Sequence, residues 1–101
     1  MATRYRTFKE FYPFYLQEHA NRTCRRLHFA GSAIVLALLA AVLVTGELAL
    51  LWLLPLVGYG FAWVGHFFFE HNRPATFQYP LYSLMGDWVM FRDMLTGRLA
   101  W

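Results

Sequence analysis

Two long apolar runs dominate the pattern of hydrophobic and polar positions along the chain. The first covers residues 27–45 and the second covers 48–69, and Glu47 is the only formal charge in this stretch, apart from two histidines. At a rise of 1.5 Å per residue, the 19 residues of the first run reach about 28 Å, close to the roughly 30 Å hydrocarbon core of a bilayer. Runs of this length predict membrane-spanning helices.

The two runs meet at a turn signal. Gly46 suits the C-terminus of one helix and Glu47 suits the start of the next, so we expect a hairpin of two spans over about residues 24–45 and 48–70. Pro55 is expected to kink the second span, because proline removes a backbone donor and clashes with the preceding turn. Three glycines of this span would let another helix, or a second copy of the chain, approach closely. They are Gly58, Gly60 and Gly65.

An amphipathic segment precedes the hairpin. Over about residues 7–22, aromatic and apolar side chains fall on one stripe at helical spacing. We interpret this segment as a helix that lies in the membrane interface. Pro13 is expected to break or kink it. Asn21 or Thr23 is suited to cap a new helix that continues into the first span.

A second amphipathic segment follows the hairpin. A helix is predicted over about residues 80–96, with Gly97 as its stop signal, and its charged residues make it too polar to be a third span. Its predicted apolar stripe consists of Leu84, Trp88, Phe91 and Leu95. The predicted fold is therefore a single all-α membrane domain over residues 1–101: a two-span helical hairpin flanked by an N-terminal interfacial helix and a C-terminal amphipathic helix.

Charge predicts the orientation of the hairpin and excludes one class of partner. The chain is 58% hydrophobic and 15% charged, with a net charge of +3. Lys and Arg flank the two runs and are absent from the turn, so the positive-inside rule places both termini on the cytoplasmic side. They do not follow one helix face, so no nucleic-acid partner is expected. The basic residues are Arg4, Arg6, Lys9, Arg22, Arg25, Arg26, Arg73, Arg92 and Arg98.

Three of the four histidines are expected to meet. An antiparallel hairpin with its tip near Gly46 places His28 and His66 at nearly the same depth. His19 lies on the apolar stripe of the preceding segment, and a break in the helix after it would fold it toward His28. Ionisable groups at membrane depth usually face the bundle interior and serve function. Three imidazoles with the Glu70 carboxylate close by suit a divalent transition metal such as Fe, Zn, Cu or Ni.

Other readings of these residues stay open. His28 and His66 on facing helices are also placed to bind haem as axial ligands. Alternatively, the histidines are polar anchors of a non-catalytic hairpin that scaffolds other proteins. His71 points about 140° away from His66 on a helix and is less suited as a ligand. The interfacial arginines either anchor the chain against lipid headgroups or include one that binds a substrate carboxylate. They are Arg22, Arg25, Arg26 and Arg73.

Three motifs resemble a family of small membrane proteins first described as a domain of unknown function. The characterised fungal member is an endoplasmic-reticulum Fe(II)-dependent dioxygenase that shortens 2-hydroxy fatty acids by one carbon. The chain after Pro74 looks more like short bacterial relatives, which implies a bacterial inner membrane. The motifs lie within about residues 11–76 and read Tyr15-Leu16-x-Glu18-His19-x-Asn21-Arg22, Leu27-His28-x-x-Gly31 and Gly65-His66-x-x-Phe69-Glu70-x-x-x-Pro74-Ala75.

The resemblance implies an activity and a role for particular residues. The activity is α-oxidation of a 2-hydroxy fatty acid with O₂, in which the C1–C2 bond breaks. The resemblance marks Asn21, Arg22 and Glu70; we expect Arg22 and Glu70 to act in catalysis, and Asn21, Arg73 and Asp87 to bind or support the substrate. Glu70 or Asp87 is a fourth ligand, a partner of a histidine's second nitrogen, or part of a structural ion pair. We expect Glu70 to bind the second nitrogen of a histidine and Asp87 to belong to a structural ion pair. The implied Fe(II) ligands are His19, His28 and His66.

Overall fold

The computed structural model describes residues 5–101, and every regular element in this range is helical. The predicted all-α class is therefore confirmed for the described part of the chain. Arg4, one of the residues used for the orientation, lies outside this range. The elements in chain order are α1 (Phe8–Gln17), α2 (Arg22–Thr45), the 3-10 helix η1 (Leu48–Trp52), α3 (Leu53–Val64), the π-helix η2 (Gly65–Glu70), the 3-10 helix η3 (Ala75–Phe77) and α4 (Pro80–Leu95).

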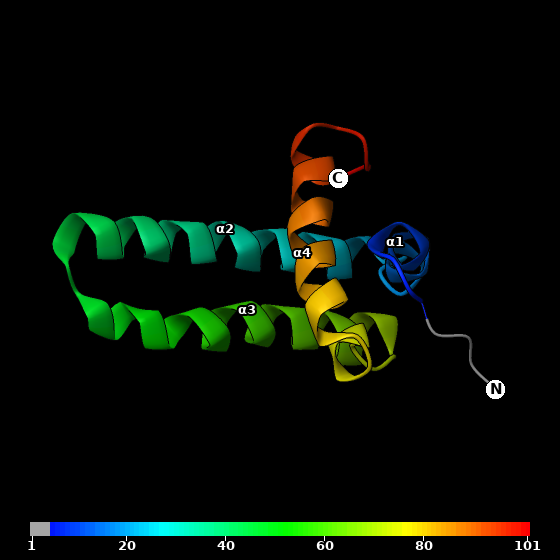
Figure 1. Ribbon diagram of the computed structural model, residues 1–101, viewed down its shortest axis with the longest axis horizontal. Helices are drawn as coiled ribbons and strands as arrows, with labels where there is room; N and C mark the ends of the chain where they lie inside the picture. The colour runs from blue at the N-terminus through cyan, green and yellow to red at the C-terminus, as the bar shows by residue number, and fades with distance from the viewer. Residues whose placement is uncertain (1–4) are drawn as a thin grey trace.

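The two apolar helices lie side by side and run antiparallel, and α4 crosses them near the end away from their turn (Figure 1). Elements η1, α3 and η2 follow one another without a break and form the second long apolar helix, Leu48–Glu70. This helix and α2 are each long and apolar enough to cross a membrane, judged by length and composition. Large apolar side chains are exposed on both helices, among them Leu43 at 87%, and such surfaces mark contact with lipid or protein.

The turn between α2 and η1 forms where the sequence predicts it. Gly46 has a φ of 72°, and its N–H donates to the Val42 carbonyl at 2.8 Å, as in a left-handed helix cap. Pro55 is the third residue of α3, where a helix leaves the backbone N–H unpaired in any case. The helix changes from 3-10 to α geometry at Leu53, two residues before Pro55.

The predicted interfacial helix is shorter than expected. Thr7 caps α1 by accepting a hydrogen bond from the Glu10 N–H at 3.2 Å. The helix continues through Pro13, so of the expected break or kink at this residue the break does not occur, and the helix ends at Gln17. The chain then turns before Asn21, whose side chain accepts from the Cys24 N–H at 3.1 Å and caps α2. This turn separates His19 from α2.

The most deeply buried face of α4 differs from the predicted apolar stripe, of which Trp88 and Phe91 are partly buried and Leu84 and Leu95 are exposed. Leu84 and Leu95 are 52% and 66% exposed, whereas Phe91 stacks on Phe29 of α2 with ring centroids 4.6 Å apart. The reason is the partner helix: Phe11 and Tyr15 of α1 are fully buried against α4, and small or flexible side chains on α4 make room for these rings. The buried residues of α4 are Ser83, Gly86, Met90 and Met94.

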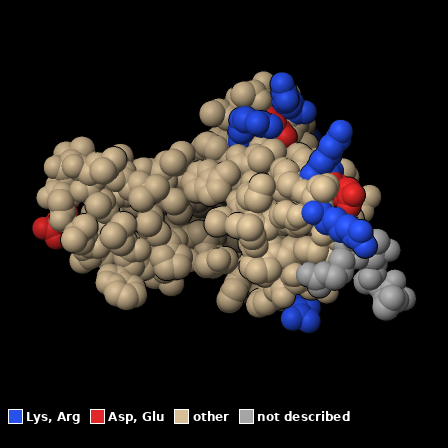
Figure 2. All heavy atoms as spheres, viewed as in Figure 1, with Lys and Arg blue, Asp and Glu red and all other residues tan. Residues whose placement is uncertain are grey.

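Charge separates the two ends of the molecule. Figure 2 shows Lys and Arg side chains at the end that carries α1 and α4, and none at the α2–α3 turn on the visible face. The sequence has no Lys or Arg between residues 27 and 72. The basic end is therefore also the end at which α1 and α4 cover the hairpin.

Candidate metal centre

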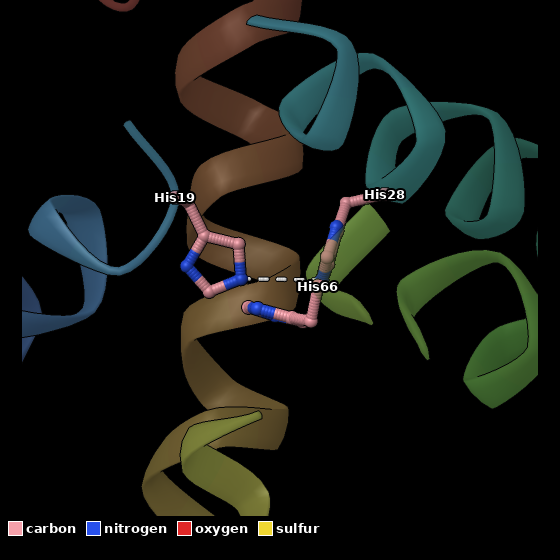
Figure 3. A group of neighbouring side chains, drawn as sticks. All are labelled: His19, His28 and His66. Atoms are coloured by element: carbon pink, nitrogen blue, oxygen red, sulfur yellow. Dashed lines mark hydrogen bonds between the residues drawn. The ribbon is translucent and has the colours of Figure 1, made fainter. Parts of the chain in front are cut away.

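Three histidines from distant parts of the chain meet at the covered end of the hairpin (Figure 3). His19 follows α1, His28 lies in the second turn of α2, and His66 belongs to η2. Their side chains are 1%, 6% and 2% exposed. One ring nitrogen from each lies within 4.8 Å of the other two. The predicted convergence of these three residues is thus present in the structure.

Each histidine uses its Nδ1 atom to donate a hydrogen bond to an oxygen. The acceptors are the Tyr15 carbonyl at 2.6 Å for His19, the Cys24 carbonyl at 2.9 Å for His28, and Asn72 Oδ1 at 2.7 Å for His66. A carbonyl oxygen can only accept, so in each neutral ring the proton is on Nδ1 and Nε2 carries a lone pair. The three Nε2 atoms are therefore the available ligand atoms.

The short distance between the Nε2 atoms of His19 and His28 favours a bound cation. His19 Nε2 and His28 Nε2 are 3.2 Å apart, so two lone pairs face each other unless a cation lies between them. Burial, reinforced by His28 and His66, holds the pKa of His19 well below its usual value, so the ring is neutral at pH 7. Neutral imidazoles whose second nitrogen is held by an oxygen are typical ligands of divalent transition metals. The residues present fit such a metal.

The π-helix η2 places His66 in the cluster. Gly65 packs directly on α2, where a Cβ atom would lie 2.9 Å from Cys24 Sγ. After η2, His71 adopts a left-handed φ of 59° and is exposed, so it turns the chain and does not join the cluster. That turn brings Asn72 back to His66. Single π-helical turns are frequent at functional sites.

The role expected of Glu70 belongs to Asn72. Asn72 accepts from His66 Nδ1–H and donates through Nδ2 to the Glu18 carbonyl at 3.1 Å, which fixes both the amide and the ring. The Glu70 carboxylate instead accepts a hydrogen bond from the Asn21 N–H and stabilises the turn that carries His19. Asn72 was not among the predicted site residues, although it lies only two residues after the end of η2, the helix that carries His66. The left-handed turn at His71 brings the side-chain carbonyl of Asn72 to His66.

Tyr15 and Asp87 form the wall beside His19. The Tyr15 ring stacks on the His19 ring with centroids 4.0 Å apart, and its hydroxyl donates to the Asp87 carboxylate. Burial raises the pKa of Asp87 to about 6, opposed by the Tyr15 hydrogen bond. Burial, and then Asp87, raise the pKa of Tyr15 well above its usual value, so Tyr15 remains the donor. Asp87 lies in the site and not in the structural ion pair that we expected.

Two cavities meet at Asp87. One of about 20 Å³ lies among the three histidines, and a second of about 200 Å³ extends between α2, α3 and α4. Asp87 and His28 line both, as do Tyr59 and Ala62. A ligand in the larger cavity is therefore in contact with the mouth of the histidine cluster.

The arginines lie farther from this centre than expected. Arg22 is exposed at the start of α2 and lines neither cavity. Arg73 is exposed with its guanidinium 5.1 Å from the Phe77 ring centroid. Arg25, to which no specific role was assigned, donates to the His19 carbonyl at 3.1 Å. Arg25 therefore stabilises the turn that presents His19.

Replacing Asn72 with alanine is expected to weaken metal binding about ten- to a hundredfold, the usual effect of removing the partner of a histidine ligand. The His66 ring would lose the acceptor at 2.7 Å that fixes its tautomer and orientation. Chelator competition on the purified protein measures the affinity. Arg73→Ala is the control, since Arg73 is exposed on the same loop. Equal affinities of the two variants would contradict this role of Asn72.

Comparison with known protein families gives a match over nearly the whole chain. A family model described as 2-hydroxy-palmitic acid dioxygenase Mpo1-like matches residues 5–99. No curated protein and no solved structure was found to match the chain. The matched range contains the three histidines together with Tyr15, Asn72 and Asp87, so it covers the whole candidate metal centre.

Proposed function

The chain belongs to the Mpo1-like family, described as 2-hydroxy-palmitic acid dioxygenases, and from this premise we propose that it is an Fe(II)-dependent dioxygenase of 2-hydroxy fatty acids. The observation that carries the proposal is the buried meeting of three imidazoles, each with its Nδ1 atom at hydrogen-bond distance from an oxygen, which leaves Nε2 as the ligand atom. Histidine ligands with open coordination positions suit non-haem Fe(II) and oxygen chemistry. The product would be a fatty acid one carbon shorter.

His19, His28 and His66 would hold the iron through Nε2. Bound Fe(II) would supply O₂ activation and coordination of the 2-hydroxy carboxylate end of the substrate. The chain itself orients the ligands: the carbonyls of Tyr15 and Cys24 retain the Nδ1 protons of His19 and His28. Burial of the cluster excludes bulk water. Asp87, at the mouth of the cluster, is placed to accept a hydrogen bond from the substrate hydroxyl.

We further propose that α2 and Leu48–Glu70 cross a bacterial inner membrane, with α1 and α4 at the cytoplasmic interface. Support comes from the exposed apolar surface of both helices and from the basic residues at the end where α1 and α4 lie (Figure 2). The metal centre would then lie just below the headgroups, where a fatty acid resides. Self-association through the second span has less support than its three glycines suggested, since Gly58 and Gly65 face α2.

The haem alternative is not favoured by the site. The space among the three histidines is about 20 Å³, and the ring centroids of His28 and His66 are 5.0 Å apart. A porphyrin does not fit between these rings.

Incubation of the iron-loaded protein with 2-hydroxypalmitic acid and O₂ tests the proposed function. Release of the acid one carbon shorter supports it, and an unchanged substrate in the presence of bound iron contradicts it.

Replacing Asp87 with asparagine is expected to reduce the preference for 2-hydroxypalmitic over palmitic acid about ten- to a hundredfold, the worth of a hydrogen bond to a charged group. Asparagine keeps one neutral acceptor oxygen, which Tyr15 already engages, and replaces the second carboxylate oxygen by an NH₂ donor, so the charged acceptor for the substrate hydroxyl is lost. Binding of both acids to the purified protein measures the preference.

Asp93→Asn is the matched control for this variant. Asp93 lies on the same helix and accepts from the Tyr12 hydroxyl at 2.7 Å, but it lines neither cavity. We expect Asp93→Asn to keep the preference at a similar cost in stability. Equal loss of preference in both variants would show that Asp87 acts only through packing.

A further inference from the structure

The cavity between α2, α3 and α4 has a polar end and an apolar end. His28 and Asp87 line the end next to the histidine cluster, while Val35, Leu54 and Pro55 line the other. The surface is hollowed beside α4, over the space between α2 and α3 (Figure 2). A cavity of about 200 Å³ with this polarity suits an elongated ligand that is oxidised at one end only.

The cavity follows the hairpin axis. From His28 to Val35, seven residues along α2, it extends about 10 Å toward the α2–α3 turn, at 1.5 Å per residue. Apart from His28 and Asp87, its lining carries no ionisable group except the phenol of Tyr59. Hydrocarbon is therefore the chemistry that the far part of the cavity favours.

Gly58 lies at this apolar end. A Cβ atom built on Gly58 would lie 3.8 Å from Val35 Cγ2 on the facing helix, an ordinary contact, so a methyl group is accommodated without strain. Any longer side chain at Gly58 would extend into the space between the helices. Gly60, two residues further along α3, has nothing within 4 Å of the same constructed atom and provides a reference on the outer surface.

We propose that this cavity binds the acyl chain of the substrate, with its tail toward the α2–α3 turn, and that Gly58 sets the length of chain that fits. The inference rests on the proposed function for the identity of the oxidised end. It is carried by the continuity of the cavity with the histidine cluster through His28 and Asp87. It makes Gly58 a specificity-determining residue.

The test compares Gly58→Ala, Gly58→Leu and Gly60→Leu in the detergent-purified full chain. Binding of 2-hydroxypalmitic acid and of 2-hydroxyhexanoic acid, whose tail ends short of Gly58, is measured beside the iron content. Each methyl or larger group in a hydrophobic site changes binding by about tenfold or more. We expect Gly58→Ala and then Gly58→Leu to bind 2-hydroxypalmitic acid progressively more weakly, with 2-hydroxyhexanoic acid unaffected. Gly60→Leu should bind both acids like the wild type.

The outcomes separate this inference from the proposed function. Wild-type affinity for 2-hydroxypalmitic acid in both Gly58 variants would overturn the inference, and so would an equal loss for both acids. Iron-loaded wild type that binds neither acid would overturn both the substrate and the cavity assignment. Length-selective loss at Gly58 in a protein without iron would support the cavity and overturn the Fe(II) centre.

Discussion

His66→Ala is expected to remove the iron and the oxygenase activity together. His66 supplies one of three ring nitrogens that lie within 4.8 Å of one another, and two remaining imidazoles cannot retain Fe(II) against a chelator as three do. The substitution also leaves the Asn72 carbonyl without its donor at 2.7 Å. Elemental analysis of detergent-purified protein, with helical content checked by circular dichroism, measures the loss directly.

His71→Asn is the control for this variant. His71 is exposed and has a left-handed φ of 59°, a backbone conformation that asparagine tolerates. It lies five residues from His66 but outside the cluster, so iron content and activity should match the wild type. Retention of iron by His66→Ala, or loss in both variants, would contradict the assignment of His66 as a ligand.

Gly86→Ala is expected to have the second-largest effect, by forcing Tyr15 against His19. A Cβ atom at Gly86 would lie 2.8 Å, 2.9 Å and 3.1 Å from three atoms of the Tyr15 ring. The ring cannot retreat, because it stacks on His19 with centroids 4.0 Å apart. Overpacking of this kind costs about 1–3 kcal/mol of stability, and the displaced His19 should also lower iron affinity. Thermal unfolding in detergent and chelator competition measure the two effects.

Gly60→Ala is the control for this variant, because it is expected to raise the stability that Gly86→Ala lowers. Gly60 lies in α3 with nothing within 4 Å of a constructed Cβ atom. Replacing a helical glycine by alanine without strain stabilises by about 0.4–1 kcal/mol, chiefly through the unfolded chain. We therefore expect higher stability and unchanged iron affinity for Gly60→Ala. Wild-type stability and affinity in Gly86→Ala would show that Tyr15 does not position His19.

The parts of the site that could be predicted from the sequence follow from local signals and helix register. Gly46 marks the turn, and an antiparallel hairpin about this turn fixes the common depth of His28 and His66. Asn21 was one of two candidate caps, and the break before it predicts the approach of His19. Each of these inferences uses the spacing of residues along one or two helices.

The remaining features depend on contacts between distant segments. The most deeply buried face of α4 packs on Tyr15, which requires the glycine at position 86, and an apolar stripe identified from α4 alone does not reveal this contact. Asn72 reaches His66 only because η2 is a π-helix and His71 turns left-handed. Asp87 meets the site because α4 crosses the hairpin (Figure 1) and places this carboxylate in the lining of the cavity that the three histidines share. Hydrophobic periodicity carries none of this information.

X-ray absorption at the iron edge of the purified, iron-loaded wild-type chain tests the central claim most directly. The spectrum reports the number and kind of atoms bound to the metal. We predict a nitrogen shell with the multiple-scattering signature of three imidazoles and no sulfur, although Cys24 Sγ lies 3.7 Å from His28 Nδ1. A chain that takes up no iron, or iron bound without imidazole nitrogen, would contradict the account.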